Sequence, residues 1–231
     1  NTDIYKFAYA NRGATPVATG TVQGRILNQY SMGEHAGNLR VATTVDARFE
    51  CGFFECVQVE QAHNNVYVLS QANDALSVIG SVQDIAPRET IQAARFIGER
   101  GYVVTFEQID PLFTLDLSDP TNPRVIGELK VPGFSTFLVP MDADHLLAVG
   151  QYVPPPGEPG NWGVQVSIFD VTDFANPVRS SNVIIGADTG AYSEATWDPK
   201  AFTYFAEGGM VALPVSIYPD YGDVIFIEGD G

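Results

Sequence analysis

Basic side chains are scarce in this sequence of 231 residues, which holds nine Arg and three Lys against 28 acidic residues and has a net charge of −16. Proteins that bind nucleic acid place clustered Lys and Arg against phosphates, so the charge balance excludes nucleic acid as the expected partner. The same deficit disfavours anionic membrane surfaces. No apolar run approaches the roughly 18 residues of a membrane helix, so we expect no membrane insertion.

Cysteine is almost absent, with Cys51 and Cys56 the two examples. A structural zinc site takes four ligands, so a single Cys-x4-Cys pair does not favour one. The pair is predicted to form a disulfide in an oxidising compartment, and free buried thiols are the alternative, because spacing alone does not fix the geometry of a bridge. The chain starts at Asn1 without a leader, which fits either a processed secreted protein or part of a longer chain.

Motifs of the common enzyme classes are missing as well. The sequence has no G-x-S-x-G nucleophile, no H-E-x-x-H, no P-loop and no G-x-G-x-x-G. His63 and His145 precede strand-like runs and are predicted to be turn residues rather than metal ligands. These patterns predict no catalytic residue and no cofactor.

Strand signals are abundant. β-Branched and aromatic runs such as RGYVVTFEQ alternate with turns marked by 22 Gly and 15 Pro. One element, Asp-x-x-Asp-x-x-Asn-Pro, occurs at 116–123 and again 54 residues later at 170–177. Four antiparallel strands per repeat of about 50 residues are typical of a β-propeller blade. An all-β propeller with about four blades is therefore predicted. A single Greek-key sandwich is the alternative, but it does not explain the repeat.

The predicted strands include residues 28–34, 38–45, 124–131, 178–185 and 223–231. Together the strands divide the chain into predicted blade units, namely residues 1–24, 25–83, 84–132, 133–187 and 188–231. The first unit holds only the last two strands of a blade, the next three hold four strands each, and the last holds the first three. A complete four-bladed ring would use one strand fewer. The count favours a fragment of a larger propeller.

The repeated Asp-rich element is predicted to close the turn between the third and fourth strands of a blade. Asp side chains accept backbone N–H groups two residues later, and the Pro holds the preceding Asn extended. A calcium ion held by these carboxylates, or bound in the channel, is the alternative. Calcium takes six or more oxygens, and no loop here is rich enough in Asp to supply them.

Several stretches resemble those of a known family. They are LNQYSMGEHAGNLRVATT (27–44), GERGYVVTFEQIDPLFTLDLSDPTNPRVIGELKVPGFSTFL (98–138), HLLAVG (145–150), SIFDVTDFANP (167–177) and SEATWDPKAF (193–202). In this order they are similar to secreted bacterial and archaeal proteins with a C-terminal β-propeller domain, distantly related to WD repeats. The resemblance implies a secreted or cell-surface propeller and no defined activity. Pro199 stands where the family usually has His, so a role for that His is not carried over.

Seven residues are candidates for ligand binding because they are polar or aromatic and interrupt or flank apolar runs. Loops between inner strands gather at the channel mouth of a propeller, where such side chains can form one site. The candidates are Arg95, Glu107, Asp110, Glu194, Trp197, Asp198 and Lys200. The structural alternative is that Arg40 and Arg95 pair with carboxylates between blades and that Asp110 shapes a turn.

Two functions remain open. The first is a non-catalytic extracellular module that binds an unknown protein, peptide or glycan, with the remaining blades of a longer chain as further partners. The second is an extracellular hydrolase or lyase with Glu107, Asp110, Glu194 and Asp198 at the channel mouth. The second requires at least two of these carboxylates within about 5–10 Å of each other.

Overall fold

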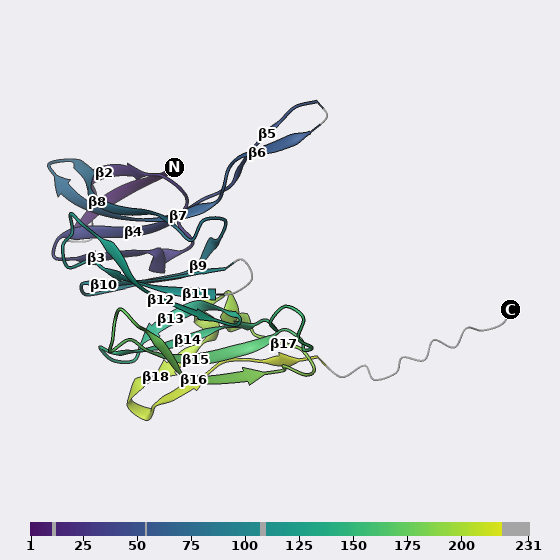
Figure 1. Ribbon diagram of the computed structural model, residues 1–231. Coiled ribbons are helices and arrows are strands. Elements are labelled where there is room, and N and C mark those ends of the chain that lie inside the picture. The colour runs from purple at the N-terminus through teal and green to yellow at the C-terminus, as the bar shows by residue number, and fades with distance from the viewer. Residues whose placement is uncertain (11–12, 54, 107–109, 219–231) are drawn as a thin grey trace, which may run out of the picture.

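The computed structural model describes residues 1–10, 13–53, 55–106 and 110–218, and almost all of its regular structure is β-strand. The strands form small antiparallel sheets that stack in a row, with the β1–β2 hairpin near one end and β18 at the other (Figure 1). The prediction of an all-β fold built from four-stranded sheets is confirmed.

Two sheets have four strands each, hydrogen-bonded in the order of the sequence. The first contains β9 (Thr90–Ile97), β10 (Arg100–Phe106), β11 (Asp110–Asp116) and β12 (Arg124–Val131). The second contains β13 (Phe134–Pro140), β14 (His145–Tyr152), β15 (Gly163–Asp170) and β16 (Val178–Ile185). Each is a simple meander in which every strand pairs with the strand that follows it.

A third meander contains β3 (Met32–His35), β4 (Asn38–Val45), β7 (His63–Ala72) and β8 (Ala75–Ile85). The hairpin of β1 (Thr2–Ala10) and β2 (Gly13–Val22) touches its outer edge through one parallel pair, Thr19 with Ala75. A second hairpin, β5 (Arg48–Cys51) and β6 (Cys56–Glu60), is inserted between β4 and β7.

The last part of the chain forms short elements. β17 (Ala191–Tyr192) pairs with β20 (Ser216–Ile217), and β18 (Thr203–Phe205) pairs with β19 (Met210–Ala212). Four 3-10 turns are described, η1 (Gln29–Ser31), η2 (Glu194–Thr196), η3 (Pro199–Ala201) and η4 (Ala206–Gly208). The expected strand at 223–231 lies outside the described residues.

The strand predicted at 28–34 is wrong in its first half. Asn28 accepts a hydrogen bond from the backbone N–H of Tyr30 at 2.9 Å and caps the 3-10 turn η1, so the strand starts at Met32. An Asn side chain that satisfies a free backbone donor favours such a turn over an extended run.

The hydrophobic core lies between the sheets. One cluster, which includes Tyr102, Leu112 and Phe169, joins the β9–β12 sheet to the β13–β16 sheet. A second, which includes Val66, Val103 and Leu115, joins the β3–β8 meander to the β9–β12 sheet. The third packs Ile4, Ala18 and Val22 of the β1–β2 hairpin on the other face of the meander. Strands buried on both faces explain the runs without polar alternation.

Three glycines mark where successive sheets touch at their outer strands. A Cβ on Gly20 of β2 would lie 2.5 Å from the carbonyl oxygen of Leu76 on β8. A Cβ on Gly80 would lie 2.4 Å from that of Pro120, and one on Gly127 would lie 2.8 Å from that of Phe174. At Gly80 and Gly127 the turn between the third and fourth strands therefore rests on a glycine of the preceding outer strand, and Gly20 meets the start of the fourth strand β8 instead.

Candidate functional site

The repeated Asp-rich element forms the predicted turns. Asp116 and Asp119 accept hydrogen bonds from the backbone N–H groups of Ser118 and Thr121 at 3.0 and 2.9 Å. In the second copy, Asp170 accepts from Thr172 at 2.9 Å, and Asp173 accepts from Ala175 at 3.1 Å. The turn interpretation is confirmed in both copies.

These hydrogen bonds lower the pKa of each of the four carboxyls. The main cause for three of them is a side-chain hydrogen bond from the residue two positions later, Ser118, Thr121 or Thr172. For Asp173 it is the side-chain amide of Asn176, whose Nδ2 donates at 2.9 Å. A hydrogen bond donated to a carboxyl favours its charged form and so opposes protonation.

We expect the protein to lose stability in acid as the Asp carboxylates of these turns are protonated. A folded pKa below the unfolded value of about 3.9 stabilises the native state above that value, and the contribution disappears as the pH falls through the folded pKa. The urea midpoint should therefore decrease from pH 5 to pH 2. In Asp119→Asn and Asp170→Asn, the amide oxygen still accepts the turn hydrogen bond but cannot be protonated, so the decrease should be smaller. An unchanged decrease in both variants would contradict this assignment.

The structure places four of the predicted site residues in one exposed loop. Ser193 caps η2 by accepting from the N–H of Ala195 at 3.1 Å, and Asp198 caps η3 by accepting from that of Lys200 at 2.9 Å. Trp197 stacks on Tyr192, with 6.2 Å between ring centroids. Glu194, Trp197, Asp198 and Lys200 are all exposed. The loop is held by capping and ring stacking, and Asp198 has a structural partner.

Arg95 lies elsewhere, on the first strand of its sheet. Its guanidinium sits over the ring of Tyr30, 4.9 Å from the centroid. Arg40 is 4% exposed and donates to the carbonyl oxygen of Gly98, with its guanidinium 5.5 Å from the ring centroid of Phe96. Burial lowers the pKa of Arg40. The ring of Tyr30 is thus the contact found for Arg95, whereas Arg40 contacts a ring and a backbone carbonyl and also feels the charge of the Glu34 carboxylate, which partly opposes the fall of its pKa.

The other two candidates, Glu107 and Asp110, come from the segment between β10 and β11. Glu107 lies outside the described residues, and of Asp110 only the backbone, at the start of β11, is described. The hydrolase or lyase hypothesis requires two of the four candidate carboxylates to lie close together. That pairing therefore stays a prediction. Among the described residues, no three His, Cys, Asp or Glu side chains gather in an arrangement that could hold a metal ion.

The β5–β6 hairpin is a feature whose surface the sequence did not single out. Cys51 and Cys56 form a disulfide that closes its tip, as predicted. The hairpin projects away from the stacked sheets (Figure 1). It carries large apolar side chains that face solvent, with Phe53 95% and Phe49 56% exposed, and Val57 and Val59 exposed as well.

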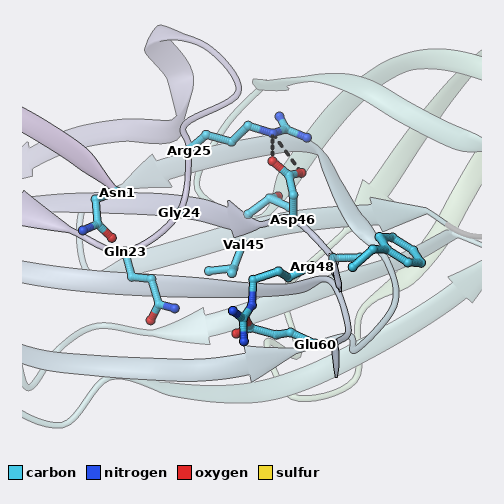
Figure 2. Close-up of a pocket in the computed structure, with 11 residues that line it drawn as sticks. Asn1, Gln23, Gly24, Arg25, Val45, Asp46, Arg48 and Glu60 are labelled. Atoms are coloured by element: carbon cyan, nitrogen blue, oxygen red, sulfur yellow. Dashed lines mark hydrogen bonds and ion pairs between the residues drawn. The ribbon is translucent and has the colours of Figure 1, made fainter. Parts of the chain in front are cut away.

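A pocket of about 500 Å³ opens at the foot of this hairpin (Figure 2). Residues from the β2–β3 loop, the end of β4 and both hairpin strands line it, and they include charged side chains of both signs. The Nε of Arg25 donates to both carboxylate oxygens of Asp46, at 3.1 and 2.9 Å. The Nε of Arg48 lies 3.7 Å from Oε2 of Glu60. The ring of Phe49 adds an apolar wall.

The local backbone keeps the pocket open. Gly24 has a φ of +92°, and a Cβ there would lie 2.7 Å from the carbonyl oxygen of Thr44. Arg25 and Thr44 exchange backbone hydrogen bonds of 2.8 and 2.9 Å across this close approach. The Oγ1 atoms of Thr2 and Thr43 donate to the carbonyls of Gly24 and Gln23, each at 2.7 Å. The backbone of the rim is therefore held by hydrogen bonds within the fold.

No helix in the described ranges is long and apolar enough to cross a membrane. Comparison with known proteins gives two archaeal relatives, both named only as uncharacterized proteins. The one from Archaeoglobus fulgidus is 39% identical over 194 residues, which are 84% of this chain and 27% of that protein. The one from Methanocaldococcus jannaschii is 34% identical over 203 residues, which are 86% of this chain and 30% of that protein.

The chain therefore spans less than a third of the length of these relatives. A family described as beta propeller domain matches residues 1–229, almost the whole chain. This match agrees with the row of four-stranded meanders and with the repeated turns. The chain belongs to the beta propeller domain family.

Proposed function

We propose that this chain is a non-catalytic binding module that acts outside the cell and holds a protein partner through the β5–β6 hairpin and the pocket at its foot. The observation that carries the proposal is the hairpin itself, which is cross-linked by a disulfide and exposes Phe49, Phe53, Val57 and Val59 to solvent. The register places Phe49 beside Gln58 on one face of the hairpin and Val57 beside Glu50 on the other, so both faces expose apolar side chains. Exposed apolar surface on one short element marks an interaction site in soluble proteins.

The hairpin is suited to a protein partner. Aromatic residues dominate the binding energy at the centre of protein interfaces, and a rim of polar groups surrounds them. Phe49 and Phe53 supply the aromatic anchors, and the Arg25–Asp46 and Arg48–Glu60 pairs supply a polar rim. The charges of the rim are already paired, so a partner is not required to neutralise them.

The disulfide supports both the rigidity and the location of the site. Cross-linking Cys51 to Cys56 restricts the hairpin before binding, which reduces the entropy lost on complex formation. Disulfides form and persist in oxidising compartments, which favours a secreted or cell-surface protein.

The test uses a displayed library of random peptides as the protein probe and a glycan array as the competing probe. We expect the chain to select peptides, and the Phe49→Ser/Val57→Ser variant to bind them at least tenfold more weakly. The matched control is Val178→Ser/Val183→Ser, which removes two exposed valines from β16 and should bind within twofold of the unaltered chain.

Three results would overturn the proposal. They are equal peptide binding by the hairpin variant and the unaltered chain, selection of glycans alone, and binding to neither probe. Circular dichroism of both variants shows whether the sheets are intact. A loss of binding in the hairpin variant supports the proposal only when its spectrum matches that of the control.

A further inference from the structure

The β1 strand occupies a position that has two neighbours in every complete meander. The third strand of each meander lies between the second and the fourth, as β7 does between β4 and β8 and β15 does between β14 and β16. The β1–β2 hairpin leads into β3 as the third and fourth strands of other sheets lead into the next sheet. Thus β1 has the place of a third strand.

Only one edge of β1 is paired among the described residues. From Thr2 to Ala10 it pairs with β2, from Val22 back to Gly13, and no described strand pairs with its opposite edge. An unpaired strand edge presents a row of free N–H and C=O groups that favours pairing with another strand. Tyr9 is 88% exposed, and Tyr5 and Phe7 are exposed on the same side of the strand.

A groove of about 320 Å³ runs beside this free edge. It lies between β1 and the β3–β4 strands, and its apolar lining includes Ile4, Met32, Leu39 and Leu76. At the other sheet contacts, this space holds the first strand of a meander: β9 packs against β3 and β4, and β13 packs against β9 and β10. Met32 and Leu39 remain only half-buried, since no strand of the described ranges covers them.

The lengths of the relatives indicate where the missing strands come from. The residues matched to this chain make up 27% of the Archaeoglobus protein and 30% of the Methanocaldococcus protein. Similar chains therefore carry many further residues, and about 50 suffice for one blade. No comparable observation favours a second copy of the chain as the source of these strands.

We propose that an antiparallel β-hairpin from the same, longer polypeptide completes this blade. Its second strand pairs with the free edge of β1, and its first strand fills the groove against Met32 and Leu39. Both strands are apolar on both faces, because each is covered by a neighbouring sheet as β10 and β14 are. The proposal is independent of the binding function assigned to the β5–β6 hairpin.

Thiol labelling tests this placement. Cys51 and Cys56 are bonded to each other, so a cysteine introduced by Met32→Cys is the single free thiol of the 231-residue chain. We expect it to react with a maleimide at least tenfold more slowly in the longer polypeptide than in the 231-residue chain. Val78→Cys, on the exposed face of β8, is the control and should react at equal rates, within twofold, in both.

Hydrogen exchange of the unaltered proteins gives a second readout that needs no substitution. The peptide covering residues 2–10 should exchange at least tenfold more slowly in the longer polypeptide. Equal labelling and equal exchange in both proteins would overturn the proposal. So would protection in the 231-residue chain that increases with its concentration, which identifies a second copy as the occupant, or a reading frame that encodes no further pair of strands.

Discussion

Gly127→Ala is expected to lower the free energy of unfolding by about 3 kcal/mol, because the added methyl group pushes two sheets apart. Its Cβ would lie 2.5 Å from Oγ1 of Thr114 and 2.8 Å from the carbonyl oxygens of both Phe174 and Ala175. Two of these three atoms belong to the backbone of the next sheet and cannot rotate away. The displacement also weakens the hydrogen bond that Thr114 donates to Phe174, 2.6 Å long, which contributes about 1 kcal/mol.

The measurement is urea unfolding followed by circular dichroism and by intrinsic fluorescence. Gly13→Ala is the matched control, because the nearest atom to its Cβ is the carbonyl oxygen of Ala10 at 3.8 Å, an ordinary contact. It should change stability by less than about 0.5 kcal/mol. Gly80→Ala should resemble Gly127→Ala, since its Cβ would lie 2.4 Å from the carbonyl oxygen of Pro120. Equal midpoints for Gly13→Ala and Gly127→Ala would rule out tight docking at these glycines.

Most strands of the four-stranded sheets could be predicted from the sequence because each depends on a local run. The predicted runs at 38–45, 124–131 and 178–185 coincide with β4, β12 and β16. The turns could be predicted equally well, since an Asp that accepts a hydrogen bond from a residue two positions later needs no partner from elsewhere in the fold. Repetition of both signals in one order then indicated the propeller.

The glycine contacts could not be predicted in this way. Gly20, Gly80 and Gly127 are separated by 60 and 47 residues and are three of 22 glycines, so no spacing distinguishes them. Their common property is the close approach of backbone from the neighbouring outer strand or from the turn that leads into it. That property exists only once the sheets are stacked.

The candidate binding site shows the same limit. The disulfide between Cys51 and Cys56 could be predicted from the sequence. The strands β5 and β6 that carry it are only four and five residues long and mostly exposed, so no alternation of apolar and polar residues marked them. The pocket joins Arg25, Asp46 and Glu60 from three parts of the chain. The polar candidates chosen from the sequence, such as Asp198 and Arg95, instead have partners within the fold.

Asn64→Ala should cost about 3 kcal/mol of unfolding free energy, because it leaves several buried polar groups without partners. Asn64 is fully buried, and its Oδ1 accepts a hydrogen bond of 2.7 Å from Oγ1 of Thr44. Its Nδ2 donates to the carbonyls of Ile85 and Glu89 at 3.0 and 3.1 Å. Thr44 Oγ1 in turn accepts from the N–H of Ile91 at 3.2 Å. The network joins the second and third strands of one meander to the first strand of the next.

A double-mutant cycle with Thr44→Val separates this network from simple loss of packing. Both substitutions remove the same Thr44–Asn64 bond, so the double variant should be more stable than the sum of the single losses predicts, by about 1 kcal/mol. The control is Asn182→Ala, whose exposed side chain accepts from Ser167 at 3.1 Å and is replaced by water at a cost below about 1 kcal/mol. Strict additivity of the two buried substitutions would show that the network has no energetic coupling.

Thr44 also lines the pocket at the foot of the β5–β6 hairpin. Asn64→Ala should therefore loosen that pocket as well, and faster hydrogen exchange of residues 44–49 would show this.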